Sequence, residues 1–185
     1  MDLSPFVRHY DAMFDFGDDI DKIVQSFEFK PTMVGMASHA RVDVLVRSAQ
    51  AIDLTAAARG VASTSIAKRA DYRVHQALME VAKRYRTEFP WFDFTTAHES
   101  ITLLRYENGQ CYKQHVDSGR GIDRTLTVIL GLNEGYEGGQ LALFDGAMAV
   151  RVGKGQALAF PSNFMFPHEV TPVTKGVRYS AVCWF

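Results

Sequence analysis

The spacing of hydrophobic residues divides the chain into a helical first half and a second half built of strands. Apolar residues at helical spacing follow the acidic pair Asp18-Asp19 and predict a helix from Ile20 to Phe27. A second helix is expected from Asp71, as its N-cap, to about Glu88, with Pro90 ending it. One apolar stripe runs along this second helix and consists of Val74, Leu78, Val81 and Tyr85.

The segment between these helices has a different pattern. Val42, Val44 and Val46 alternate with Asp43, Leu45 and Arg47, and this alternation predicts a strand. Residues 48–70 are rich in Ala, Ser and Thr and have no clear period. We expect them to be a mixture of weak helix and loop, and a plain surface connection is favoured over a lid above a substrate.

From about residue 99 onward, short β-rich runs alternate with turns of Gly, Asn and Asp. This pattern is typical of a jelly-roll or sandwich, with the helices packed on one outer face, and the fold class is α+β. The expected strands are Ile101–Tyr106, Tyr112–Asp117, Thr125–Leu132, Gln140–Phe144, Met148–Val152, Gln156–Phe160, Phe166–Thr171 and Val177–Trp184.

One of these strands has two distinct faces. Leu126, Val128, Leu130 and Leu132 form a uniformly apolar face suited to meet the helices. The opposite face, which carries Thr127, is smaller and more polar, as expected where a sheet lines a ligand pocket.

Length and composition narrow the class of protein. The 185 residues fit about one domain, and 20 basic residues against 21 acidic ones leave a net charge of -1. This balance argues against nucleic-acid or anionic-membrane binding, and no apolar run approaches the roughly 20 residues that span a bilayer. The N-terminus lacks the regions of a signal peptide, and two cysteines fit a reducing compartment, so we expect a cytoplasmic protein.

The candidate chemistry begins with His115 and Asp117. Residues two apart on a strand project to the same face, so both side chains can reach one metal ion, although a simple His–Asp contact at a strand end explains the pair equally well. His168 opens a later strand, and two imidazoles with one carboxylate suit non-haem Fe(II) better than a closed zinc site. Arg178 follows on the last strand, where a buried guanidinium needs an anion such as a dicarboxylate cosubstrate.

A set of short motifs in the second half carries a resemblance to a known family. Residues 106–184 resemble the catalytic core of the Fe(II)/2-oxoglutarate-dependent dioxygenases, in the prolyl 4-hydroxylase-like branch. The matching anchors are Arg105–Gly109, Tyr112–Asp117, Arg124–Thr127, Leu132-Asn133, Gly138–Leu141, Leu143-Phe144, Gly155, Phe160–Ser162, His168–Val170, Pro172-Val173, Gly176–Tyr179 and Trp184.

This resemblance implies a fold and a ligand set. The fold would be a double-stranded β-helix, a cupin-like jelly-roll core over residues 99–185, with residues 1–98 supplying helical support and the first strands of one domain over residues 1–185. The implied iron ligands are His115, Asp117 and His168, which are also the catalytic centre. The implied contacts to 2-oxoglutarate are Arg178, Tyr106 and Thr127. Two positions depart from the family pattern: Gly131, where many relatives have Tyr, and Gln140, where they usually have Glu.

The resemblance also implies an activity. We expect a dioxygenase that uses Fe(II), 2-oxoglutarate and O2, with ascorbate as an optional reductant, and that hydroxylates a prolyl or other amino-acid residue of a peptide or protein while releasing succinate and CO2. The alternatives are a hydroxylase of a free amino acid or small metabolite and a non-catalytic metal- or ligand-binding jelly-roll. A nucleic-acid dealkylase is disfavoured, because Trp184 stands where that branch carries a second Arg. No nucleic-acid or membrane partner is expected, and the choice between monomer and homodimer is open.

Overall fold

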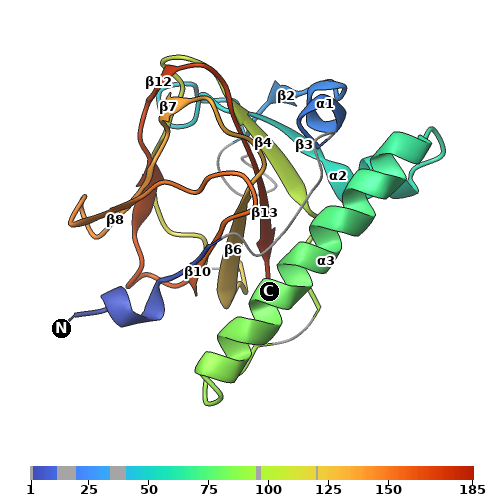
Figure 1. Cartoon of the computed structure of the whole chain (residues 1–185). Helices are drawn as coiled ribbons and strands as arrows, with labels where there is room; N and C mark the ends of the chain where they lie inside the picture. The colour runs from blue at the N-terminus through green and yellow to red at the C-terminus, as the bar shows by residue number, and fades with distance from the viewer. Residues whose placement is uncertain (1, 12–19, 34–40, 95–96, 120) are drawn as a thin grey trace.

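The structure, a computed structural model, describes residues 2–11, 20–33, 41–94, 97–119 and 121–185. Its largest helix, α3 (Ser65–Glu88), lies along one side of a strongly curved sheet assembly (Figure 1). In the described part of the chain, no helix combines the length and the apolar content needed to cross a bilayer.

The strands form two main antiparallel sheets and a small two-stranded ribbon. The larger sheet has the order β1-β10-β6-β13-β4-β3-β2, the second has the order β5-β11-β8-β9, and the ribbon pairs β12 with β7. Their bounds are β1 Arg8–Tyr10, β2 Lys30–Pro31, β3 Gln50–Asp53, β4 Thr102–Tyr106, β5 Tyr112–His115, β6 Leu126–Gly131, β7 Glu137–Gly138, β8 Leu141–Leu143, β9 Met148–Val150, β10 Ala157–Pro161, β11 His168–Val170, β12 Val173–Lys175 and β13 Arg178–Trp184. A short 3-10 helix, η1 (Ser4–Phe6), precedes β1.

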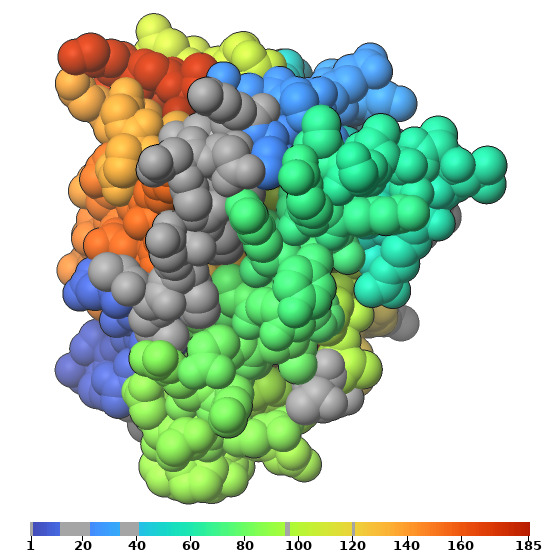
Figure 2. All heavy atoms as spheres, turned by 45° about the vertical axis from the view of Figure 1, so that its right-hand side comes forward, coloured from blue at the N-terminus to red at the C-terminus, as the bar shows by residue number. Residues whose placement is uncertain are grey.

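The apolar face of β6 packs against α3, as its sequence predicts. All four leucine and valine positions of this face are fully buried, and they share one core with the predicted stripe of α3. The stripe positions Val74, Leu78, Val81 and Tyr85 are each at most 1% exposed. The surface view in Figure 2 has α2 (Leu54–Arg59) and α3 running across this side of the molecule. The expectation that the helices cover one outer face is therefore confirmed.

The first helix is confirmed and the start of the second was wrong. α1 spans Ile20–Gln25, while Asp18-Asp19 lie outside the described residues. α3 begins six residues before Asp71, because Thr64 is its N-cap and accepts a hydrogen bond from the backbone N–H of Ala67. Asp71 lies inside the helix and accepts a hydrogen bond from the Thr55 hydroxyl at 3.4 Å. The helix ends at Glu88, just before Pro90, as expected.

The strand expected at Val42–Val46 is also wrong. These residues form a turn in which the backbone N–H groups of Val46 and Arg47 donate to the Asp43 carbonyl and the Asp43 carboxylate accepts from Leu45. An Asp side chain that accepts a hydrogen bond from a nearby backbone N–H competes with sheet pairing and so favours a turn. The strand of this region is β3, which begins a few residues later. It lies within residues 48–70, where we expected a mixture of weak helix and loop, and it pairs with β4.

All eight strands expected in the second half are present, seven of them with shorter bounds and β10 shifted by one residue. β5 ends at His115, so Asp117 lies just beyond the strand rather than on it. The strands that the sequence did not indicate are β1, β2, β3, β7 and β12, each of two to four residues. Such short segments carry too few residues to display a period.

Replacing Leu130 by Ala tests the contact between α3 and the sheet. Leu130 is fully buried in the core shared with α3, so the cavity should lower the free energy of unfolding by about 2–5 kcal/mol. Urea denaturation measures the change. The matched control is Val61→Ala at a fully exposed position, which should stay within about 0.5 kcal/mol of the parent. Equal, small effects of both substitutions would contradict this packing.

Candidate functional site

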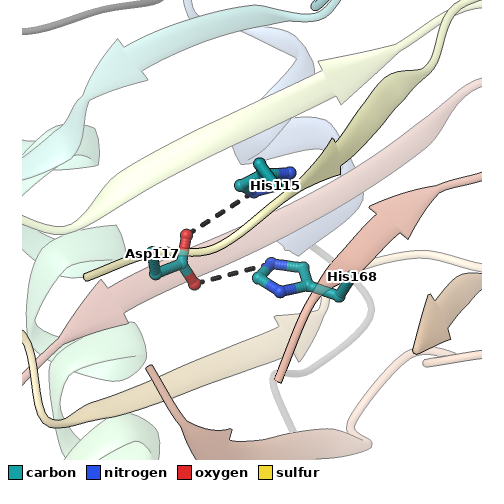
Figure 3. Close-up of side chains that lie close together, drawn as sticks. All are labelled: His115, Asp117 and His168. Carbon is teal, nitrogen blue, oxygen red and sulfur yellow. Dashed lines mark ion pairs between the residues drawn. The ribbon is translucent and has the colours of Figure 1, made fainter. Parts of the chain in front are cut away.

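The site is built where β5 and β11 pair. These antiparallel neighbours place His115 directly opposite His168, with ring centroids 4.3 Å apart. The chain leaves β5 at His115, and the Asp117 carboxylate faces both imidazoles from one side (Figure 3). Residues separated by more than fifty positions are thereby brought together by one backbone register.

The three side chains present one ligand atom each toward a common point. Asp117 Oδ1 lies 3.5 Å from His115 Nε2, and Asp117 Oδ2 lies 3.5 Å from His168 Nε2. One such atom from each residue lies within 4.8 Å of the others. Ligands bound about 2.1 Å from a metal ion at right angles are about 3 Å apart, so this group can close on an ion with small side-chain shifts.

Hydrogen bonds to backbone carbonyls orient both imidazoles. His115 Nδ1 lies 2.9 Å from the Lys113 carbonyl, and His168 Nδ1 lies 3.1 Å from the Phe166 carbonyl. A carbonyl can only accept, so each Nδ1 carries the proton and each Nε2 keeps its lone pair. This is the tautomer that a metal ligand requires.

Asp117 is buried and ionised. Burial alone would raise the pKa of Asp117, but the adjacent imidazoles of His115 and His168 and the Thr127 hydrogen bond outweigh it and hold that pKa well below its usual range. The Thr127 hydroxyl lies 2.7 Å from Asp117 Oδ2 and 2.8 Å from the Ser162 hydroxyl. Thr127 was expected to contact 2-oxoglutarate, and that contact stays a prediction. Its observed partners are Asp117 and Ser162.

His168 is the more deeply buried of the two histidines. Burial lowers the pKa of His168, and the neighbouring Asp117 opposes that shift only in part. Phe160 packs edge-on against the imidazole, with centroids 4.8 Å apart. At neutral pH the site therefore holds a neutral imidazole beside a carboxylate, which is the charge state that binds a divalent cation.

A cavity of about 320 Å³ opens beside these three residues, between the two main sheets. Arg178, only 1% exposed, lies on its wall and stacks over the Tyr106 ring, its neighbour in the β13–β4 register, at 5.3 Å. Its Nη1 donates to the Ser180 hydroxyl at 2.9 Å. The predicted pair of cosubstrate contacts, Arg178 and Tyr106, is thus brought together in the same cavity as the histidines.

The wall of this cavity has unused hydrogen-bond donors. Among the described residues, four buried polar atoms that line it have no partner: Arg47 Nε, Tyr106 Oη, Arg178 Nε and Trp184 Nε1. Burial raises the pKa of Tyr106, with Arg47 and Arg178 opposing, so the phenol keeps its proton and remains a donor. Buried donors without acceptors are costly, and a bound oxo-dicarboxylate would satisfy those of Arg178 and Tyr106.

The backbone explains the departure at Gly131. A Cβ added there would lie 2.0 Å from the Gly153 carbonyl oxygen and 2.4 Å from that of Val152. No tyrosine fits at this position while the neighbouring loop keeps its path. Tyr106 from β4 is the tyrosine that lines the cavity near Arg178.

Two arginines of the site had no role in our interpretation of the sequence. Arg124 forms two hydrogen bonds to the Glu99 carboxylate, donates to the Asp117 carbonyl at 3.3 Å and stacks on Trp184 at 3.7 Å. Arg47 lies in the turn that we took for a strand. Arg124 belongs to one of the motifs on which the family resemblance rests, whereas nothing in the sequence around Arg47 indicated that it lines a pocket.

Two imidazoles and one carboxylate on an antiparallel double sheet are the ligand set of metal sites of the facial-triad class. Residues 101–185 match the family model of the 2OG-Fe(II) oxygenase superfamily. Among curated proteins, a PKHD-type hydroxylase of Idiomarina loihiensis is 36% identical over 90 residues, which is 45% of this chain and 40% of that protein. A PKHD-type hydroxylase of Acaryochloris marina is 37% identical over 116 residues, covering 58% of this chain and 52% of that protein. The matched region thus spans about half or less of these relatives.

Solved structures agree with the fold. A prolyl hydroxylase of Trichoplax adhaerens, determined with a peptide fragment of the hypoxia inducible factor oxygen degradation domain, superimposes with a TM-score of 0.73 at 19% identity, covering 97% of this chain and 82% of that one. A prolyl-4-hydroxylase of Pseudomonas putida gives a TM-score of 0.67 at 23% identity, covering 97% and 91%. The fold is the double-stranded β-helix of these neighbours, as expected. Residues 101–185 are thus similar to the 2OG-Fe(II) oxygenase superfamily, a family that implies Fe(II), 2-oxoglutarate and O2.

Replacing Thr127 by Val tests the orientation of Asp117. Valine keeps the shape of threonine and removes the hydroxyl that donates to Oδ2, so the affinity for Fe(II) should fall about 10- to 100-fold. Anaerobic calorimetric titration with Fe(II) measures the affinity. Thr127→Ser retains the hydroxyl and should bind within a few-fold of the parent. Equal affinity of the Val and Ser variants would show that the hydrogen bond does not matter.

The lowered pKa of His168 predicts a pH dependence of metal-free stability. The unfolded chain takes up a proton near the ordinary value of 6.5 while the folded chain still excludes it, so the free energy of unfolding should fall as the pH is lowered from 7 toward 5. His75, whose pKa burial also lowers, contributes in the same direction. Denaturation of the parent and of His168→Gln at a series of pH values measures the slope, which the substitution should reduce. An unchanged slope would contradict the buried neutral imidazole.

Proposed function

We propose that this chain forms one catalytic domain over residues 1–185 that acts as an Fe(II)- and 2-oxoglutarate-dependent hydroxylase. The observation that carries the proposal is that one cavity holds both a His-Asp-His cluster and a buried guanidinium with no carboxylate partner among the described residues. His115, Asp117 and His168 hold the iron. Arg178 binds the distal carboxylate of 2-oxoglutarate, and the Tyr106 hydroxyl donates to it.

The protein groups bind and orient the reactants. When bound, the metal and its cosubstrate supply the oxidising chemistry, in which 2-oxoglutarate is decarboxylated to succinate while O2 is activated. Arg178 and Tyr106 fix one end of the cosubstrate, so its other end is directed toward the histidines. Thr127 and Arg124 hold Asp117 through its carboxylate and its carbonyl. Phe160, against His168, keeps that side of the site dry.

The primary substrate we propose is an amino-acid residue of a peptide or protein, or an amino-acid-like molecule. The support comes from the neighbours, which include a prolyl hydroxylase solved with a peptide fragment. Hydroxylation of a prolyl C–H bond is the finer assignment. Ascorbate would act only as a reductant that restores Fe(II).

Anaerobic addition of Fe(II) and then 2-oxoglutarate tests the proposal. We expect a visible charge-transfer band with one equivalent of each, followed by succinate release when air is admitted. Arg178→Gln should weaken 2-oxoglutarate binding at least about 10-fold, because a charged hydrogen-bonded pair is lost. Arg105→Gln is the matched control on the neighbouring strand, since Arg105 pairs with Gln50 and Glu107 outside the cavity. Absence of the band, or a band without succinate, would contradict the hydroxylase; the second result would indicate a binding module.

A further inference from the structure

The cavity contains one more cation than the proposed cosubstrate needs. Three arginines line it, namely Arg47, Arg124 and Arg178. Arg124 is neutralised by a two-pronged ion pair with Glu99, and Arg178 is matched by one carboxylate of 2-oxoglutarate. In the parts of the chain that the structure describes, no carboxylate pairs with Arg47, and its buried Nε has no acceptor.

Arg47 is held rigidly at the edge of the site. It forms an antiparallel bridge with Tyr112, the first residue of β5. On one side of it the Val46 carbonyl accepts from the Lys113 backbone at 2.8 Å, and on the other side Ser48 bonds to both backbone groups of Cys111. The turn that carries Arg47 is therefore docked onto the strand that ends in a metal-binding histidine.

A stack of side chains connects Arg47 with that histidine. Its guanidinium lies over the Tyr112 ring at 4.5 Å, and the Tyr112 ring lies nearly parallel to the His115 ring, 3.6 Å away and tilted by 20°. The cation thus stands close to the reaction centre but on the far side of an aromatic ring from the histidine. A guanidinium that uses its face for stacking still has its edge free to donate in the plane.

We propose that Arg47 binds a carboxylate of the primary substrate, so that the substrate class is an anionic amino-acid compound. The carboxylate belongs either to a free α-carboxyl group or to an acidic side chain beside the hydroxylated residue. This inference rests on the proposed function and adds a determinant of specificity to it. A planar guanidinium with an unused donor and no counter-charge is the group that recognises a carboxylate best.

The sum of charges supports this assignment. Bound Fe(II) with Asp117 and the two carboxylates of 2-oxoglutarate carries a net charge of -1, which Arg178 balances, and Glu99 balances Arg124. The positive charge of Arg47 remains, with no carboxylate paired to it among the described residues. A substrate carboxylate removes that imbalance, whereas a neutral substrate leaves it in place.

Matched pairs of ligands test the proposal. Protein loaded anaerobically with Fe(II) and 2-oxoglutarate is titrated in a calorimeter with L-proline and L-prolinamide, with N-acetyl-L-proline and its amide, and with blocked dipeptides Pro-Glu and Pro-Gln. We expect at least one acid to bind about 10- to 100-fold more tightly than its amide. The pair that differs most identifies the source of the carboxylate.

Substitutions in the same turn assign the effect to Arg47. Arg47→Gln should abolish the preference for acid over amide and leave 2-oxoglutarate affinity unchanged, while Arg47→Lys should keep part of it. The matched control is Arg41→Gln, because Arg41 is exposed and pairs with Asp43 outside the cavity. Thermal unfolding verifies that each variant is folded. If Arg47→Gln does not fold, the test rests on the acid-over-amide preference of the parent protein and on its reduction in Arg47→Lys.

Three results would overturn the inference. The first is that no acid in the set of ligand pairs binds more tightly than its amide. This result includes the case in which none of the ligands binds. The second is a preference that survives in Arg47→Gln, or that Arg41→Gln removes. The third is weaker 2-oxoglutarate binding in Arg47→Gln, which would assign Arg47 to the cosubstrate. Failure of the parent protein to bind 2-oxoglutarate is a distinct outcome and would contradict the proposed function itself.

Discussion

The register of one short pair of strands determines the whole site. β5 and β11 align so that His115 faces His168, and a slip by one residue would turn either imidazole to the opposite face. Asp117 depends on the same pairing, because two residues after β5 ends its carboxylate oxygens face one ring each. The carbonyls of Lys113 and Phe166, which select the tautomer of each ring, belong to the same backbone segments. A three-residue strand therefore fixes both the position and the protonation of the ligands.

The larger sheet supports this arrangement because one of its faces packs on the helix and the other lines the cavity. One face of β6 is wholly apolar and packs on α3, so the helix stabilises the sheet without approaching the chemistry. The other face carries Thr127, whose hydroxyl reaches Asp117, and Ile129, which lines the cavity. Arg178 enters from the adjacent strand β13, where burial gives its charge a strong demand for an anion. The Ser180 hydroxyl and the Tyr106 ring offset part of the cost of burying that guanidinium, and a carboxylate in the cavity would offset more of it.

Much of this could be predicted from the sequence, and the exceptions have physical causes. The apolar stripe of α3, the two-faced β6 and the eight strands of the second half follow from side-chain periodicity, and the ligand set followed from a resemblance carried by motifs. The helix start at Asp71 failed because Thr64, in a stretch without a period, caps the helix instead. The strand at Val42–Val46 failed because Asp43 closes a local turn. Arg47 was missed because its importance arises from contacts with β5, which lies more than sixty residues away.

The central claim is that three side chains bind one divalent ion next to Arg178, and anomalous diffraction tests it most directly. Crystals grown anaerobically with Mn(II), a stand-in for Fe(II), and 2-oxoglutarate would be measured near the manganese absorption edge. The account predicts one anomalous peak per chain, bonded to His115 Nε2, His168 Nε2 and an Asp117 oxygen, with the distal carboxylate of 2-oxoglutarate on Arg178. A peak elsewhere, or none between these residues, would contradict it.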